Sequence, residues 1–243
     1  MPSIRRVLVK VSGEAIAGDR TSWFNIDRVS KVCRDVKSVL DTGIRVVIVV
    51  GGGNVIRGRD WQNNEVVKPE TADAMGMLST AINGIMLRDV LSHHGVDAGI
   101  VSNLSLPFEI SHANSFNIAK MMAQDKVAIF VGGIGLPYCS TDTVSVIAAS
   151  LSECDIILKA THVDGIYSDD PKVTCEAVHI PEMTYQEAVD RQLNFMDNAA
   201  LIMAMQRKIP IYIFSIEEKD CLIRAINEDI KLSIVRASER IPQ

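Results

Sequence analysis

The chain has 243 residues, and its 47% hydrophobic and 23% charged residues give the balance of a soluble globular protein with a full hydrophobic core. Its formal net charge of -5 argues against a dominant electrostatic contact with nucleic acid or an anionic membrane. No apolar run is long enough for a signal peptide or a membrane span, and the five cysteines include no C-x-x-C pair. We therefore expect reduced thiols and a cytoplasmic location.

Short apolar segments alternate along the chain with segments whose apolar residues recur at helical spacing. Strands separated by helices indicate βαβ units and a mainly parallel sheet. The sequence thus predicts an α/β fold, formed by a single domain over residues 1–243. In chain order the pattern predicts a strand at 6–11, a helix at 26–40, a strand at 46–50, a helix at 72–91, a strand at 98–101, a helix at 116–122, a strand at 127–131, a helix at 143–151, a strand at 155–158, a helix at 201–206, a strand at 211–214, a helix at 222–226 and a final edge strand at 233–235.

Ligands of such sheets bind beyond the carboxyl ends of the strands, so the loops after the strands are the first place to search. The first loop joins Lys10 to Ser12 and Gly13, where a cation and accessible backbone N–H groups can meet a phosphate. The alternative is a salt-bridged lysine followed by a turn glycine. This loop alone favours the alternative.

The second loop has three consecutive glycines, Gly51 to Gly53, followed by Asn54 and Arg57. Three glycines cost chain entropy unless something must approach the backbone closely. A phosphate on backbone N–H groups fits that requirement, and Arg57 would add a planar fork for its oxygens. A tight turn rarely needs three glycines, so this loop favours phosphate binding.

The third and fourth loops follow the strands at 127–131 and 155–158. The third contains Gly132 and Gly133 and ends in hydroxyl groups before Asp142, which is either a helix N-cap or a catalytic residue. In the fourth loop Lys159 can reach a nucleotide phosphate, although the segment can equally be a surface hairpin around an Asp-Gly turn. Together the glycine-rich loops indicate a site for two phosphate-bearing ligands. Neither the Walker pattern nor G-x-G-x-x-G occurs, which argues against a P-loop kinase or a dinucleotide dehydrogenase.

These loops resemble those of the amino acid kinase family and, within it, the bacterial UMP kinases. The matching strings are KVSGE at 10–14, VGGGN at 50–54 with RG at 57–58, ADAMGML at 72–78, STD at 140–142, LKAT at 158–161, VDG at 163–165 and DP at 170–171. The resemblance implies a three-layer αβα sandwich and reversible transfer of the ATP γ-phosphoryl group to UMP in pyrimidine nucleotide biosynthesis. It also implies Mg²⁺ bound through the ATP phosphates, with no metal ligands from the protein.

The same resemblance implies roles for individual residues. UMP would be bound mainly by the N-terminal part of the chain and ATP mainly by the C-terminal part. Asp73 can instead be only a first-turn helix acid, and Tyr167 only a half-buried strand aromatic. The residues implied for ATP are Lys10, Val11, Ser12, Gly13, Gly53, Arg57, Lys159, Thr161, Tyr167 and Asp170; those for UMP are Gly52, Asp73, Ile134, Gly135, Leu136, Pro137, Tyr138, Cys139, Ser140 and Thr141; those for catalysis are Lys10, Arg57 and Asp142.

Phosphoryl transfer needs positioning and charge neutralisation more than covalent chemistry. We expect Lys10 and Arg57 to stabilise the charge on the transferred group. Asp142 either orients Lys10 or holds a metal-bound water. Another phosphotransferase of the same family, acting on a different acceptor, and a non-catalytic nucleotide sensor are the competing hypotheses.

Two segments depart from the family pattern. Ile134 and Leu136 replace polar residues of the loop implied for UMP, so contacts there would rely more on the backbone. Residues 18–25 differ from a glycine-bearing stretch tied to GTP activation in the family, which argues against GTP as an activator. The family further suggests a homohexamer with UTP as an allosteric inhibitor.

Overall fold

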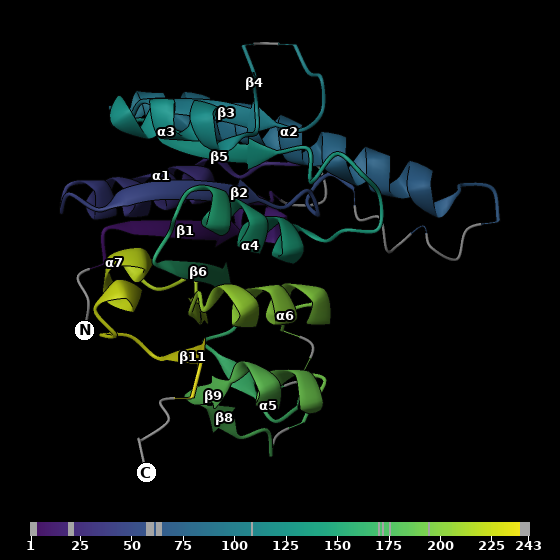
Figure 1. Ribbon diagram of the computed structural model, residues 1–243, viewed down its shortest axis with the longest axis vertical. Coiled ribbons are helices and arrows are strands. Elements are labelled where there is room, and N and C mark those ends of the chain that lie inside the picture. Colours follow the sequence, from purple (N-terminus) through teal and green to yellow (C-terminus); the bar gives the residue numbers. More distant parts are fainter. Residues whose placement is uncertain are drawn as a thin grey trace.

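A nine-stranded sheet runs through the protein in the order β4-β3-β5-β2-β1-β6-β10-β11-β9 (Figure 1). The computed structural model describes residues 4–18, 22–56, 61, 65–107, 109–169, 171, 173–174, 176–193 and 195–238. All neighbouring strands of this sheet are parallel except β10 and β11. The strands are β1 (Arg6–Val11), β2 (Arg45–Val50), β3 (Ala98–Ser102), β4 (Ser111–His112), β5 (Val127–Val131), β6 (Ile156–Thr161), β9 (Glu182–Thr184), β10 (Ile211–Ser215) and β11 (Leu232–Arg236). A separate antiparallel pair joins β7 (Ile166–Tyr167) to β8 (His179–Ile180).

Helices cover both faces of the sheet, which confirms the predicted three-layer α/β architecture (Figure 1). One face carries α1 (Ile26–Leu40), α2 (Pro69–His93) and α7 (Cys221–Ile226), whose apolar residues share one buried cluster. The other carries α3 (Ser115–Ala123), α4 (Thr141–Leu151), α5 (Tyr185–Asp190) and α6 (Asn198–Arg207), which share a second cluster. The short 3-10 helix η1 (Gly13–Ile16) follows β1.

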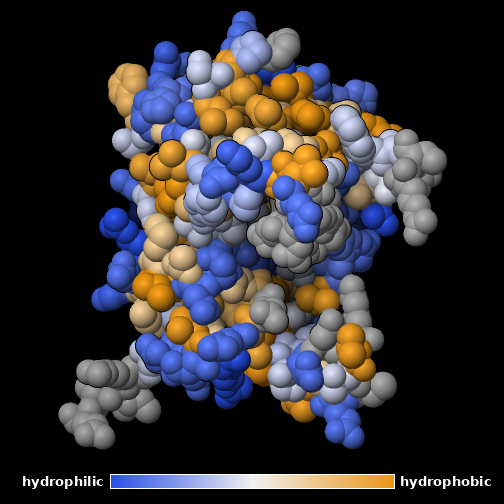
Figure 2. Space-filling model, turned by 90° about the vertical axis from the view of Figure 1, so that its right-hand side faces the viewer, coloured by the Kyte–Doolittle hydropathy of each residue, from blue (hydrophilic) through white to orange (hydrophobic). Residues whose placement is uncertain are grey.

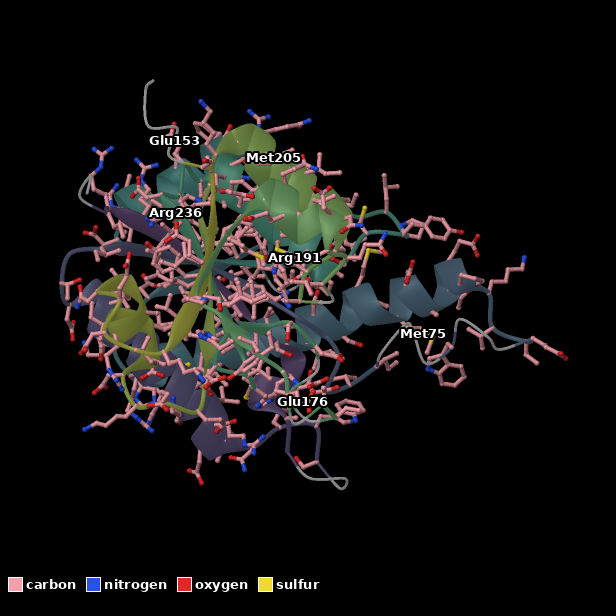
Figure 3. All side chains as sticks on the ribbon, turned by 90° about the horizontal axis from the view of Figure 1, so that it is seen from below. Met75, Glu153, Glu176, Arg191, Met205 and Arg236 are labelled. Carbon is pink, nitrogen blue, oxygen red and sulfur yellow. The ribbon has the colours of Figure 1, made fainter. Side chains whose placement is uncertain are left out.

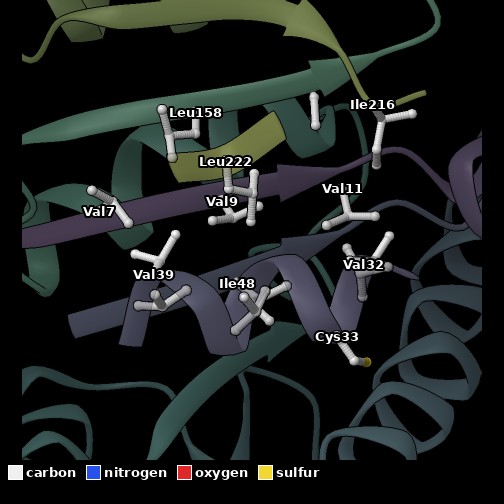
Figure 4. Packing of buried hydrophobic residues seen from close by; sticks show 14 of the residues in the cluster. Val7, Val9, Val11, Val32, Cys33, Val39, Ile48, Leu158, Ile216 and Leu222 are labelled. Atoms are coloured by element: carbon white, nitrogen blue, oxygen red, sulfur yellow. The ribbon is translucent and has the colours of Figure 1, made fainter. Parts of the chain in front are cut away.

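The continuous apolar runs arise because the central strands are buried on both faces. In β1, Val7 and Val9 pack with α1 and α7, whereas Leu8 points to the opposite cluster. Figure 4 shows the first of these clusters, with Val39 of α1 and Leu222 of α7 on either side of the β1 valines. Side chains of a strand alternate between the two faces, so even-numbered residues of β1 face α4 and odd-numbered ones face α1.

Helix α2 is the longest helix described and extends beyond the rest of the structure (Figure 1). It begins at Pro69, which suits the first helical position, and runs past the predicted end at residue 91 to His93. In Figure 3, Met75 of α2 and Glu153, just before β6, lie on opposite sides of the protein. The amino-terminal half of α2 therefore lies toward the carboxyl ends of the parallel strands.

The prediction of a final edge strand at 233–235 is wrong in one respect. Strand β11 does form there, but β9 pairs with its outer side in parallel register. Strand β9 has only 3 residues, which is too few to give a period-2 signal in the sequence.

No helix among the residues described is both long and apolar enough to cross a bilayer. Figure 2 views the protein from the side to which α2 extends, and a group of apolar side chains lies near the top of that view among hydrophilic ones. This end of the protein is thus chemically mixed rather than uniformly charged.

Candidate active site

A cleft of about 400 Å³ opens at the carboxyl ends of β1, β2 and β5. It brings together residues from two sets that the sequence assigns to different nucleotides. Its lining includes Lys10, Ser12, Gly13 and Gly53 of the residues predicted for ATP, and Gly52, Asp73, Leu136, Cys139, Ser140 and Thr141 of those predicted for UMP.

Several predicted residues do not line this cleft. The side chain of Val11 is fully buried in the core, so only its backbone can meet a ligand. Lys159 lies buried next to Lys10, and Thr161 and Tyr167 lie farther along at the end of β6 and in β7. Arg57 and Asp170 lie outside the residues that the structure describes. Of the third-loop residues predicted for UMP, those that do not line the cleft are Ile134, Gly135, Pro137 and Tyr138.

Lys10 and Lys159 form one pair of the parallel register between β1 and β6. Both side chains therefore project to the same face of the sheet, toward the N-terminus of α4. There Asp142 lies between them, with Oδ1 at 3.1 Å from Lys10 Nζ and Oδ2 at 2.7 Å from Lys159 Nζ. Lys159 also donates a hydrogen bond to the carbonyl oxygen of Phe195. A single carboxylate thus bridges two ammonium groups.

Burial and charge compete in this triad. Burial alone would raise the pKa of Asp142, but the charges of Lys10 and Lys159 outweigh burial and hold that pKa below its usual value. For Lys159, burial lowers the pKa, the charge of Lys10 lowers it further, and Asp142 opposes both, which leaves a pKa of about 8. The triad has two cations and one anion, so it can attract one further negative charge.

Ser140, not Asp142, is the N-cap of α4. Its Oγ accepts hydrogen bonds from the backbone N–H groups of Asp142 and Thr143, at 3.0 and 3.4 Å. The interpretation of Asp142 as an N-cap is therefore wrong, because the residue already lies inside the first turn. Its side chain pairs instead with the two lysines.

The glycines of the first two loops are required by their protein neighbours. A Cβ on Gly13 would lie 2.7 Å from both Asn54 Oδ1 and the backbone nitrogen of Gly53. A Cβ on Gly52 would lie 2.7 Å from the carbonyl oxygen of Gly76 in α2. Close packing between the two loops and α2 thus accounts for these glycines, and the packed loops still present their backbone to the cleft.

Asp73 joins α2 to the third loop. One of its oxygens accepts a hydrogen bond from the backbone N–H of Tyr138 at 2.8 Å, and the Tyr138 hydroxyl donates to Glu70. Tyr138 has a φ of 66°, which its two polar partners help to hold. The interpretation of Asp73 as a first-turn helix acid is wrong, because α2 begins at Pro69 and Asp73 lies beyond its first turn; its carboxylate instead fixes the loop that borders the cleft.

Tyr167 lies within a polar cluster beside β6. Its hydroxyl donates to Asp164 Oδ1 at 2.6 Å and accepts from Lys231 Nζ at 2.9 Å, and Lys231 also pairs with Asp164 Oδ2 at 2.8 Å. The ring of His179 packs edge-on against the Tyr167 ring, with centroids 5.3 Å apart. These contacts fix the orientation of the Tyr167 ring.

Sequence reasoning missed Thr80, Asn83 and Asp197. The first two are polar positions inside a long helix, and the sequence does not show that this helix packs against Gly132, Gly51 and Asn54, which are their partners in the loops. Asp197 caps α6 by accepting from the Ala200 N–H at 2.8 Å. An aspartate before Asn-Ala-Ala is an N-cap signal that the sequence contains.

Comparison with known proteins gives consistent matches over the chain. The model of the amino acid kinase family matches residues 5–215. A uridylate kinase of Sulfurovum sp. (strain NBC37-1) is 36% identical over 234 residues, covering 96% of this chain and 99% of that protein. The crystal structure of UMP kinase from Ureaplasma parvum gives a TM-score of 0.90 at 29% identity, covering 96% of this chain and 99% of that chain. That of UMP kinase from Bacillus anthracis gives 0.87 at 30% identity, covering 96% of each chain.

Proposed function

The chain belongs to the amino acid kinase family, and on this premise we propose that it is a UMP kinase, which transfers the γ-phosphoryl group of ATP to UMP and forms ADP and UDP in pyrimidine nucleotide metabolism. The observation that carries the proposal is the bridged pair of lysines beside a cleft lined by both sets of predicted nucleotide contacts. Two anionic substrates need positive charge where their phosphates meet, and the two lysines would supply it.

The reaction needs no general base. The phosphate of UMP is largely ionised at neutral pH, so one of its oxygens can attack the γ-phosphorus directly. A bond forms between that oxygen and the γ-phosphorus, and the bond to the β,γ-bridging oxygen breaks to release ADP. Lys10 and Lys159 would stabilise the charge on the transferred group from one side. Arg57, outside the described residues, stays a predicted contributor.

Asp142 would act as a positioning residue for both lysines. Each of its oxygens faces an ammonium group, so the negative charge of this carboxylate is already paired with the two lysines. A fixed carboxylate keeps both ammonium groups in place before substrate binds, and preorganised charge is the form that stabilises a transition state best. This geometry favours the first of the two roles predicted for the residue.

Mg²⁺ would be held by the phosphate oxygens of ATP and would supply further charge neutralisation. Among the residues described, no group of three or more His, Cys, Asp or Glu side chains is arranged to hold a metal ion. The engagement of Asp142 with two lysines also fits an ion that arrives with its substrate.

The individual contacts are proposed accordingly. The backbone of Ser12, Gly13 and Gly53 would meet ATP phosphates, with Thr161 and Tyr167 toward its adenosine end. Gly52, Asp73 and the loop 134–141 would surround UMP. The loop borders the cleft with Leu136, Cys139, Ser140 and Thr141, so its polar contacts come mainly from its last residues and from the backbone.

Assembly and regulation are extensions of the same proposal. Leu78 and Ile82 of α2 are exposed at 48% and 39%, which supports a subunit contact along this helix in a homohexamer. We also propose inhibition by UTP, no activation by GTP and a cytoplasmic location, all on the family resemblance.

A panel of acceptors tests the function. ADP release is measured with ATP, Mg²⁺ and, in turn, UMP, CMP, dCMP and acetylglutamate. We expect turnover with UMP and little with the other acceptors. Strong turnover on a different acceptor would assign another activity of the family, and nucleotide binding without turnover would assign a sensor.

A further inference from the structure

Helix α2 presents two buried polar side chains to the glycine loops. Thr80 is 3% exposed and Asn83 is fully buried, and they lie three residues apart, so they share one face of the helix. Polar side chains are rarely buried to this degree without hydrogen bonds that use them fully. Both have such bonds, and in each case the partners include loop atoms next to the cleft.

Thr80 holds the start of the third loop. Its hydroxyl donates to the carbonyl oxygen of Met77 at 2.7 Å and accepts from the N–H of Gly132 at 2.7 Å. Gly132 follows β5 directly and has a φ of 75°, and a Cβ at this position would clash with Ser102 Oγ. The loop can therefore leave the sheet in this direction only with a glycine, and Thr80 fixes that glycine's N–H.

Asn83 holds the second loop. Its Nδ2 donates to the carbonyl oxygen of Gly51 and to Asn54 Oδ1, both at 2.6 Å, and its Oδ1 accepts from Asn54 Nδ2 at 3.0 Å. Asn54 Oδ1 in turn lies 2.7 Å from the Cβ position of Gly13. The amide pair is thus packed between α2 and the loop that follows Lys10.

We propose that Thr80 and Asn83 are positioning residues through which α2 sets the distance between the acceptor and the transferred phosphoryl group. Thr80 acts on the loop that would surround UMP. Asn83 acts on Gly51 and, through Asn54, on the loop that follows Lys10. The inference rests on the proposed function, because it assigns each loop to one side of the phosphoryl transfer. It predicts that the two residues affect different kinetic constants.

Thr80→Val tests the acceptor side, with Thr80→Ser as the matched control. Valine keeps the shape of threonine but leaves the buried Gly132 N–H without its partner, so the KM for UMP should rise about tenfold while the KM for ATP stays within about twofold. Serine retains the hydroxyl and should stay near the wild-type values. An unchanged KM for UMP, or an equal rise in both KM values, would overturn the role of Thr80.

Asn83→Leu tests the effect of Asn83 on Gly51 and on the loop that follows Lys10. Asn54→Leu and the double variant serve as comparisons. Each single variant removes the amide pair between Asn83 and Asn54, so kcat should fall about tenfold in either, and the double variant should lose clearly less than the product of the two single losses. Thermal unfolding of each variant first establishes that it folds. Folded variants with wild-type kcat, or a double variant whose loss is the product of the single losses, would overturn the role of Asn83.

Wild-type protein assayed with UMP in the same experiment separates a failure of the proposed function from a failure of the positioning role. No turnover by the wild type would overturn the proposed function itself. An active wild type with kinetically silent Thr80→Val and Asn83→Leu variants would overturn only the positioning role. If Asn83→Leu does not fold, the valine and serine pair at position 80 decides the inference alone.

Discussion

Lys159 shows how one residue can make the site sensitive to pH. With its pKa at about 8, set by burial and by Lys10 against the opposing charge of Asp142, it loses its proton as the pH rises through that value. The kcat/KM for ATP reports the free enzyme and should therefore fall above a pH of about 8. A profile measured from about pH 6 to 9.5 would reveal this fall.

Two substitutions at position 159 serve as controls. Lys159→Arg keeps its charge at every pH of the profile and should move the fall to higher pH. Lys159→Met has no charge to lose, so it should reduce kcat/KM about a hundredfold and lack the step near pH 8. A step at the same pH in the arginine variant would mean that another group titrates.

Helices α4 and α6 are connected by hydrogen bonds between residues at their N-termini, and we call this connection the joint. Asp197, the N-cap of α6, accepts from the hydroxyl of Thr143 at 3.2 Å and from that of Ser140, which itself caps α4. Asp197→Ala removes both connections at once and should lower the free energy of unfolding by about 1–3 kcal/mol. Urea unfolding of the variant and the wild type measures this loss in the free energy of unfolding.

The matched control for this joint is Asp197→Asn. Asparagine is as good an N-cap as aspartate and can still accept from a hydroxyl, so it should cost well under half of the alanine effect. Equal losses for the two variants would show that the negative charge, rather than the hydrogen bonds, stabilises the joint.

Helices and strands were predictable from the sequence where an apolar pattern extended over enough residues to be recognised. The buried strands β1, β2 and β5 were recognisable as short continuous apolar runs, and the amphipathic α1 by its helical period. The short β4, β7, β8 and β9 were not predictable, because a few residues cannot establish a period. The loops of the site were predictable from their place after strands. The bridge from Asp142 to Lys159 was not, since it depends on the register between β1 and β6.

The cleft joins β1, β2, β5, α2 and the start of α4, so a ligand bound there would contact several elements of the fold at once. A ligand that binds only the folded state stabilises it, by about 2.7 kcal/mol at one hundred times its Kd. For a chain of 243 residues UMP should then raise the Tm by about 5–10 °C. Differential scanning fluorimetry measures this shift.

Uridine at the same concentration is the control for this measurement. It lacks the phosphate that would meet Lys10 and the glycine loops, so its shift should be much smaller. Equal shifts with uridine and UMP would indicate that the base and sugar, and not the phosphate, dominate binding.

The register between β1 and β6 has a consequence for how such a site can diversify. Lys10 and Lys159 are register partners on two neighbouring strands. The distance between neighbouring strands is about 4.8 Å in every β-sheet. Loops at the rim can lengthen, shorten or change residues without altering it. The spacing between the backbones of the two lysines is thus set by the sheet, whereas the loops around the cleft can change and so alter which acceptor the proposed reaction would use.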